Sequence, residues 1–466
     1  MTRRQEHRLC VGGVTVAVFA AYLLTLNPTV SLEQAGALAV AADHVGIGKY
    51  PGYPVWHMVA HLFTRLFSMV TFHGHPNPVW ATSLLSAVSG ALACGMVTYL
   101  VLRISGLLVK SAAVEGVKPV ILASAVAAGL LLAFSPVMWS QSVVTETHAF
   151  TVCYAAILLV VLVGKVSGSG TPGEGALMFL FGLGISVTPF LVLFAPVILV
   201  AMAWSGDRSW RIGLASMLVV ALAIRLCLIQ NDIRVAGGML AGFVLFVVAG
   251  HGIPATRRLA RSISGLGCGL LPYLYLPLAA SHSPPMNMGA AYSWDGFRHL
   301  IGRGQYERIV LVNPLGEPGV ILGETARLAE RLVDQFMLPV AILGVLPLLV
   351  WPFFRVAWRP LSIVLVSLVG FALPTMAAVA VVPHDIQSQL LVTRVFLPVY
   401  LLWAVCVGVG FVMAYVLARG GRAMRLSKLF RNVPIVNSIE MSPFCFLVTC
   451  CGSEAGFAGR LREWAY

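Results

Sequence analysis

Long apolar runs separated by short polar segments repeat along most of this 466-residue chain. Many of the runs approach about 20 residues, the length at which an α-helix crosses the hydrocarbon core of a bilayer. Backbone amides in lipid must be hydrogen-bonded within their own segment, so runs of this kind fold as helices. The pattern therefore predicts an all-α, polytopic membrane protein with about 11–13 transmembrane helices.

One apolar segment does not fit a lipid-facing span. Between positions 54 and 72, His57, His61 and Arg65 recur on one side of a helix, and bulky apolar residues fill the remainder. A helix with such a polar face lies along the membrane interface or edges a cavity. With this segment outside the membrane, we expect spans near 9–26, 78–102, 119–136, 148–164, 175–189, 190–205, 211–229, 237–254, 264–281, 336–353, 361–383 and 394–418.

Basic residues decide the orientation of these spans. The chain has 31 Lys and Arg against 18 Asp and Glu, a formal net charge of +13. If the first span runs outward, most basic clusters fall on the cytoplasmic side, as the positive-inside rule requires. The basic excess is then explained by the lipid bilayer, without a nucleic-acid partner. This layout places the N-terminus inside and the polar segments 27–77, 136–147 and 282–335 outside.

The first outer segment, 27–77, holds several candidate site residues. Ser31 to Gln34 has the spacing of a helix capping box, so Glu33 and Gln34 either begin a short helix or serve function. Asp43 falls near the end of that helix, where the helix dipole disfavours a carboxylate. We therefore expect a functional reason for Asp43.

A turn rich in Gly and Pro follows this helix and leads into the amphipathic segment. Lys49 and Tyr53 lie in the turn, and His57 lies on the polar face of the next helix. We expect all three to contact substrate. For His57, a solvated or structural role is the commoner alternative.

Other candidates lie later in the chain. Glu146 is expected at the edge of a span, where an ionisable residue is either functional or an edge carboxylate in contact with water. Arg303, with Gln305 and Tyr306 beside it, and Arg394, before the last span, are arginines expected on the outside. Such arginines either bind phosphate or pair with a nearby carboxylate.

The sequence does not point to a cofactor. Most of the nine cysteines lie in or beside predicted spans, and no CxxC pair occurs. We expect no cofactor, and a divalent metal is left open. Motifs for a nucleotide-driven pump, a zinc protease or a serine hydrolase are missing from the sequence. An internal repeat typical of transporters is also missing, so a transporter is the least favoured interpretation.

Three stretches resemble blocks of a family of multi-pass membrane proteins that includes the transmembrane protein O-mannosyltransferases of the GT-C superfamily. They are LEQAGALAVAADHVGIGKYPGYPVWHMVAHLF, FSPVMWSQSVVTETHAF and YLYLPLAASHSPPMNMGAAYSWDGFRHLIGRGQYERI. The resemblance implies a GT-C-like bundle with interfacial helices in the first external loop. It also implies that a sugar, mannose among the candidates, moves from a polyprenyl-phosphate donor to a protein or glycan hydroxyl. A bacterial cytoplasmic (inner) membrane is the implied location.

The chain departs from this family at its acidic motif. Where the family usually has Asp-Ser-Gly-Glu, this chain has Gln34, Ala35, Gly36 and Ala37. Two hypotheses follow. In the first, Glu33, Asp43 or Glu146 acts as the catalytic base, and the cations hold the donor phosphate. In the second, the chain is a catalytically impaired member that binds lipid-linked sugar or acts as a scaffold. We expect the GT-C-like transmembrane domain at 1–431 and a short tail at 432–466, because the apolar run in the tail, 441–451, is too short to cross a bilayer.

Overall fold

The computed structural model describes residues 3–31, 34–112, 116–168, 172–204, 209–230, 254–304, 316–350, 357–382 and 385–419. Helices dominate these residues. The strands among them are β1 (Thr71–Phe72) and β2 (His75–Pro76), which pair as a small antiparallel hairpin. The prediction of an all-α polytopic membrane protein is confirmed. The predicted span at 237–254 and the predicted tail at 432–466 lie outside the described residues.

Six helices are long and apolar enough to cross a membrane, or up to eight segments if each of two bent helix pairs counts as one span. The sequence predicts about 11–13 spans. The described residues contain six to eight helical segments that could be such spans. The six lie at Arg4–Leu24, Pro78–Lys110, His148–Val166, Arg257–Ser281, Trp358–Val379 and Leu397–Ala418.

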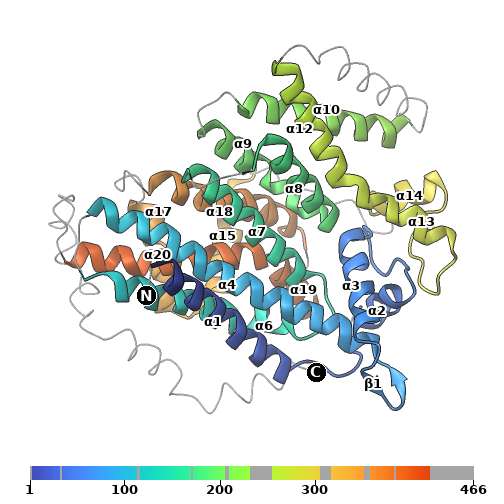
Figure 1. Ribbon diagram of the computed structural model, residues 1–466, viewed down its shortest axis with the longest axis horizontal. Coiled ribbons are helices and arrows are strands. Elements are labelled where there is room, and N and C mark those ends of the chain that lie inside the picture. Colours follow the sequence, from blue (N-terminus) through green and yellow to red (C-terminus); the bar gives the residue numbers. More distant parts are fainter. Residues whose placement is uncertain are drawn as a thin grey trace. The chain divides into compact units, whose positions relative to one another are not determined.

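The chain divides into two compact units, each described here by itself. Unit 1 comprises residues 1–35, 79–163 and 309–466, and unit 2 comprises residues 36–78 and 164–308. Figure 1 labels the elements of both. The predicted boundaries at 27–77, 282–335 and 1–431 remain predictions.

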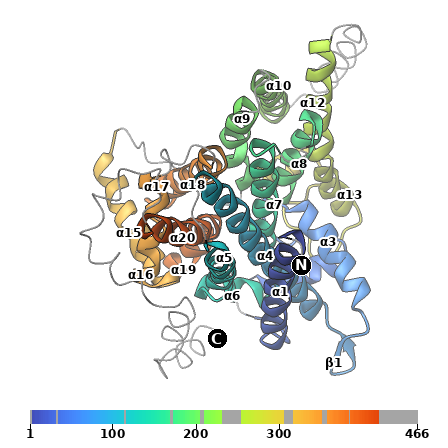
Figure 2. The ribbon, with the colours of Figure 1, turned by 60° about the vertical axis from the view of Figure 1, so that its left-hand side comes forward.

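Unit 1 is built around one very apolar helix. Its helices are α1 (Arg3–Leu24), α4 (Pro78–Ala112), α5 (Lys118–Ala133), α6 (Pro136–Ser142), α7 (His148–Val166), α15 (Pro318–Phe336), α16 (Leu338–Leu343), α17 (Leu346–Val350), α18 (Trp358–Val379), α19 (Ile386–Val395) and α20 (Leu397–Ala418). The α20 sequence is apolar on all sides, which is typical of a helix covered all round. It packs against α5, α16, α17 and α18 (Figure 2).

Unit 2 contains the two short helices predicted for the first loop, α2 (Ala35–Asp43) and α3 (Pro54–Leu66). Its other elements are α8 (Glu174–Val187), η1 (Pro189–Phe194), α9 (Ala195–Trp204), α10 (Ser209–Gln230), α12 (Pro254–Leu270), η3 (Leu271–Leu274), α13 (Tyr275–Ser281) and α14 (Trp294–Ile301). The predicted break within 175–204 falls at Thr188, whose backbone is extended, and Pro189 then begins η1.

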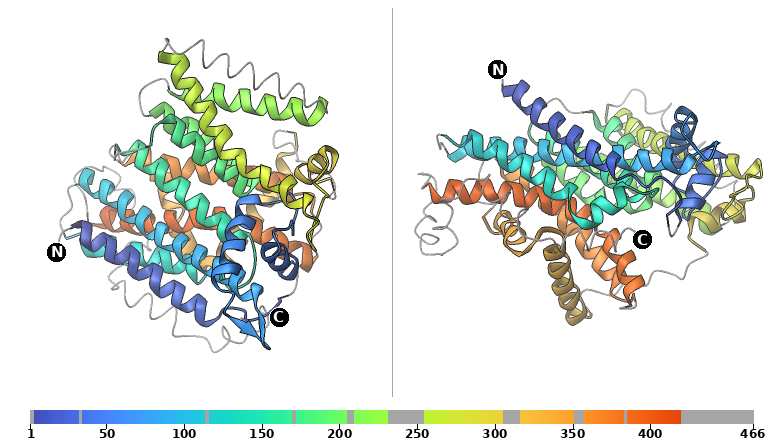
Figure 3. Two further views of the ribbon diagram at one scale, coloured as in Figure 1. Left: turned by 45° about the vertical axis from the view of Figure 1, so that its right-hand side comes forward. Right: turned by 90° about the horizontal axis from the view of Figure 1, so that it is seen from below.

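Close helix packing in unit 2 depends on glycine. The α12 helix lies along α8 and also contacts α10 (Figure 3). A methyl group added at Gly182, Gly265 or Gly269 would collide with a carbonyl oxygen of the facing helix. Arg258 pairs with Glu174 near one end of this contact, with Nε 3.2 Å from Oε2. The absence of side chains at these glycines therefore lets the backbones of α8 and α12 come into direct contact.

One predicted span is bent. Where a span at 336–353 is expected, α15 ends at Phe336, and the chain turns by 116° into the helices that begin at Leu338. Met337 has a φ of 62°, and Pro339 follows two residues later. A proline in a helix interior lacks the N–H for a backbone bond and clashes with the preceding turn, so Pro339 prevents α15 from continuing and instead lies in the first turn of the next helix. The predicted loop 282–335 thus contains most of an amphipathic helix.

Candidate functional site

The Gly/Pro-rich turn at 46–54 is attached to the segment that follows α13. Ile47 N–H donates to the Met286 carbonyl at 2.9 Å, and Met288 N–H donates to the Ile47 carbonyl at 3.0 Å. The Tyr275 hydroxyl donates to the Gly46 carbonyl at 2.9 Å. A side chain at Gly46 would collide with the Met286 carbonyl oxygen, so glycine is needed for this approach. These bonds join two segments that are far apart in the sequence: Gly46 and Tyr275 are separated by 229 residues.

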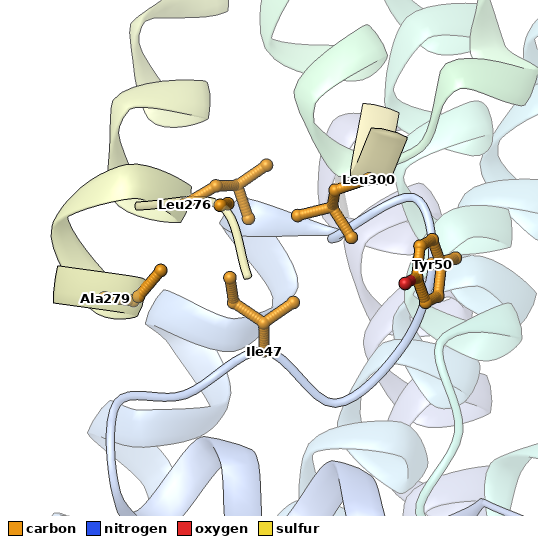
Figure 4. Packing of buried hydrophobic residues seen from close by; sticks show 7 residues of the cluster. Ile47, Tyr50, Leu276, Ala279 and Leu300 are labelled. Atoms are coloured by element: carbon orange, nitrogen blue, oxygen red, sulfur yellow. The ribbon is translucent and has the colours of Figure 1, made fainter. Parts of the chain in front are cut away.

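A small apolar core lies beneath this turn. Ile47, Tyr50, Leu276, Ala279 and Leu300 are buried together (Figure 4). Full burial of an Ile or Leu side chain contributes roughly 1.5–3 kcal/mol each. This core holds the turn against α13 and α14.

His57, in the first turns of α3, is an internal residue that bonds to this Gly/Pro-rich turn. It is fully buried, its Nε2 accepts a hydrogen bond from Gly48 N–H at 3.1 Å, and its Nδ1 lies 3.1 Å from the Tyr53 carbonyl oxygen. This network requires a neutral ring with its proton on Nδ1. Burial lowers the pKa of His57 from 6.5 to about 4. These bonds support a structural role for His57, and the substrate contact expected from its polar helix face remains a prediction.

The polar face of α3 also binds the end of α2. His61 Nδ1 lies 2.8 Å from the Ala42 carbonyl oxygen, and Arg65 Nη2 donates to the Asp43 carbonyl at 3.4 Å. Donors at a helix C-terminus satisfy carbonyls that have no partner within the helix. The Asp43 side chain is 33% exposed, and its Oδ2 lies 3.8 Å from Nε2 of His44. The expected functional role of Asp43 remains a prediction.

The adjoining side of α3 is apolar and exposed. Met58, Leu62 and Leu66 recur every four residues on it, and each is about half exposed. Met69 and Phe72 are also exposed, just after α3 and in β1. This amphipathic arrangement fits the expected interfacial helix.

Lys49 and Arg303 lie in the same unit, on segments that approach each other. Lys49 is half-buried in the turn, and the next residue, Tyr50, packs its ring edge against His299 with 6.0 Å between centroids. Arg303 is exposed just after α14 and has a φ of 55°. Sequence reasoning missed His299, which occupies the last turn of α14.

The other substrate-contact predictions for unit 2 are only partly described. Tyr53 is half-buried at the residue before α3, with a left-handed backbone. Gln305 and Tyr306 lie outside the described residues.

Glu146 belongs to unit 1 and is held tightly. It lies between α6 and α7, two residues before His148, and is 4% exposed. Thr147 N–H donates to its Oε2 at 3.0 Å. The Ser86 hydroxyl donates to the Glu146 carbonyl at 3.2 Å and accepts from the Glu146 N–H at 3.4 Å. The positive N-terminal end of α7 favours a carboxylate at this place.

A network of hydroxyl groups adjoins Glu146. The Thr145 hydroxyl lies 2.7 Å from that of Thr82 and 3.0 Å from that of Ser83. The Thr145 hydroxyl also donates to the Val79 carbonyl at 3.1 Å. Sequence reasoning missed these α4 residues. The signal for them is the recurrence of hydroxyl side chains in the first turns of an otherwise apolar helix.

Arg394 and Gln34 are the remaining predicted site residues described in unit 1. Arg394 is half-buried in the last turn of α19, where a cation complements the helix dipole. Gln34 is half-buried just before α2, and its Oε1 has no hydrogen-bond partner among the described atoms. Glu33 lies outside the described residues. Within the described part of the chain, no group of three His, Cys, Asp or Glu residues is placed to hold a metal ion.

Comparisons with known proteins connect these residues to a family. Residues 34–225 match the protein O-mannosyl-transferase TMEM260 N-terminal domain. The mouse (Mus musculus) protein O-mannosyl-transferase TMEM260 is 23% identical over 270 residues, which cover 57% of this chain and 30% of that protein. This chain therefore corresponds to under a third of its relative's length. No solved structure matches the chain.

The matched residues include α2, α3, the Lys49 turn and Glu146, so the family match covers both the first loop and the buried carboxylate. The resemblance inferred from the sequence is confirmed: residues 34–225 carry the signature of the protein O-mannosyl-transferase TMEM260 N-terminal domain family, and mouse TMEM260 is a distant relative.

Proposed function

We propose that this protein is a membrane glycosyltransferase that moves a sugar, mannose by analogy with its relative's name, from a polyprenyl-phosphate donor to an acceptor hydroxyl. A protein is the expected acceptor, with a glycan hydroxyl as the other candidate. The family match supports the reaction class. The observation that carries the proposal is the buried Glu146 carboxylate, held by Ser86 and Thr147 at the N-terminus of α7.

The chemistry requires a base and a cationic site. The acceptor oxygen attacks the anomeric carbon, Glu146 takes the acceptor proton, and the bond between that carbon and the phosphate oxygen breaks. The phosphate leaves with the electron pair of that bond, and nearby cations stabilise its charge. Arg394, in the same unit as Glu146, is assigned this second role, and the phosphate contacts expected of Lys49 and Arg303 remain predictions from the sequence. A positioned base typically contributes about 100-fold to 10,000-fold to the rate.

The first test is sugar transfer in proteoliposomes from a radiolabelled polyprenyl-phosphate-mannose donor to peptides rich in Ser and Thr. Glu146→Gln is expected to lower transfer by at least about 100-fold while donor binding is retained. Glu33→Gln and Asp43→Asn serve as matched carboxylate controls and are expected to retain transfer. If Glu146→Gln transfers as well as the native protein, Glu146 is not the base, and the carboxylate variant that loses transfer identifies it.

A second candidate function is a catalytically impaired member that binds lipid-linked sugar or acts as a scaffold. Gln34 and Ala37, in place of the family's acids, favour it. An amide at position 34 can orient a hydroxyl group but cannot take its proton at neutral pH. Saturable donor binding without transfer would support this candidate. Gain of transfer in a Gln34→Asp, Ala37→Glu double variant would show that only the acids are missing.

We also propose that the first loop lies at the outer face of a bacterial cytoplasmic membrane, with the N-terminus inside. The exposed Met58, Leu62 and Leu66 face supports contact with the lipid interface. The test is labelling of intact cells with an impermeant thiol reagent, in a background where exposed Cys268 is replaced by Ser. Tyr292→Cys is expected to react and Lys110→Cys to be protected. The reverse pattern would invert the proposed topology.

A further inference from the structure

Two polar side chains of α15 reach other helices of unit 1. Gln335 Oε1 accepts a hydrogen bond from the Val137 backbone N–H at 3.0 Å, in the first turn of α6. Arg331 Nη2 donates to Gln389 Oε1 at 2.9 Å, in the middle of α19. A third contact joins α6 and α19 directly. The three helices therefore form a closed set of contacts.

The Gln335 contact replaces a local helix cap. Val137 follows Pro136 at the start of α6, so its N–H has no partner within the helix. Ser135 precedes α6, but its hydroxyl donates backward to the Leu132 carbonyl at 2.8 Å and does not cap the helix. Because Val137 is buried, its N–H would be costly without an acceptor. Gln335, 198 residues later in the chain, supplies that acceptor.

Arg331 is fixed by several groups at once. Glu324 and Arg331 are only 1% and 8% exposed, and Glu324 Oε2 lies 3.8 Å from Arg331 Nη1. The Arg331 guanidinium carbon lies 5.1 Å from the ring centroid of Phe396, at the junction of α19 and α20. A buried cation needs such partners to offset its desolvation. Exposed ion pairs contribute little to stability because water screens them. The Arg331–Gln389 hydrogen bond involves a buried guanidinium, so we expect its loss to have a larger effect.

The two helices that α15 contacts lead to proposed site residues. The chain runs from α6 into the link that holds Glu146, and α19 carries Arg394 in its last turn. We propose that Gln335 and Arg331 are positioning residues, and that α15 acts as a brace that fixes Glu146 and Arg394 relative to each other. This inference rests on the proposed function, which assigns the base to Glu146 and a phosphate contact to Arg394.

The test uses pairs of variants that keep or remove one acceptor oxygen. Gln335→Met and Gln389→Met keep the length of the side chain and remove the acceptor, whereas Gln335→Glu and Gln389→Glu restore an acceptor. Gln335→Met is expected to lower kcat for transfer about tenfold, the order expected for loss of one buried hydrogen bond, with the donor KM unchanged. Gln389→Met is expected to raise the donor KM about tenfold, with kcat unchanged. Each Glu variant is expected to restore at least half of the native value.

Glu330→Met is the matched control, because Glu330 is exposed on the same helix. It is expected to leave both kinetic constants unchanged. If both Met variants lower kcat and raise the donor KM to the same extent, or if the Glu variants do not restore the native values, the positioning role is overturned and general destabilisation is indicated.

Backbone amide exchange separates failure of this inference from failure of the proposed function. The brace predicts faster exchange in peptides from α6 for Gln335→Met and in peptides from α19 for Gln389→Met, with no change elsewhere. If the native protein transfers no sugar but these local changes occur, the proposed function fails and the brace remains. Unchanged exchange in both helices would overturn the brace, whether or not sugar is transferred.

Discussion

Acid should weaken the first-loop turn through one histidine. The neutral His57 ring accepts from Gly48 N–H through Nε2, and protonation would place an N–H against an N–H. Burial lowers the pKa of His57 to about 4, below its ordinary value of 6.5. The opened state therefore binds a proton more readily than the folded state between these two pH values. The stability that His57 contributes is complete above pH 6.5 and is lost as the pH falls towards 4.

The size of the effect follows from the two pKa values. Between pH 7.5 and pH 4.5, the difference in proton binding integrates to a loss of about 2 to 3 kcal/mol in the free energy of opening the turn. The assay is amide exchange at Gly48 in the detergent-solubilised protein, corrected for the intrinsic pH dependence of exchange. His57→Gln is the matched control, because Gln offers an uncharged acceptor to Gly48 N–H and does not titrate.

The native protein should lose protection at Gly48 as the pH falls, and His57→Gln should lose about 2 to 3 kcal/mol less. The two proteins share every other residue, so any pH effect from the rest of the chain cancels in the comparison. Equal losses of protection in the two proteins would show that His57 is not the titrating group and would refute the assigned hydrogen-bond network.

Three further predictions concern stability and placement. Ser86→Ala is expected to cost about 1–3 kcal/mol, because it removes a buried hydroxyl that bonds both the carbonyl and the N–H of Glu146. Ser89→Ala removes a bond to Leu85 within α4 and should lower the thermal midpoint less. Gly265→Ala is expected to separate α8 from α12 and reduce the folded yield, whereas Gly267→Ala, with nothing within 4 Å of the added carbon, should be neutral or stabilising. A spin label on Leu62→Cys should be more accessible to oxygen than to a water-soluble nickel complex in liposomes, and one on Lys110→Cys should show the opposite preference.

The fold class follows from the sequence because apolar length alone determines it. Runs such as Leu397–Ala418 are apolar on every side, and their helices coincide with the predicted spans. The break in the stretch 175–204 was also predictable, because proline limits which backbone conformations are allowed there. The bend after Phe336 was missed, because an apolar run gives no information on its direction in space.

The internal partners of the candidate site are less predictable. The polar face of α3 was identified correctly, but its environment was not: His57 and His61 bind backbone groups of the turn and of α2. The sequence also gave no sign that Gln335 caps α6, because the two residues are 198 positions apart. Such pairings depend on how the helices pack, and periodicity describes each helix alone.

A stability measurement can distinguish a catalytic role of Glu146 from a purely structural one. Burying a carboxylate costs several kcal/mol of desolvation free energy, which the Thr147 N–H and the N-terminus of α7 help to offset. A carboxylate that is kept for catalysis need not stabilise the fold, and a neutral amide at the same position avoids part of this desolvation cost. Glu146→Gln is therefore expected to keep or raise the thermal midpoint while it removes sugar transfer. A lowered midpoint together with retained transfer would assign Glu146 to the fold and return the base to another carboxylate.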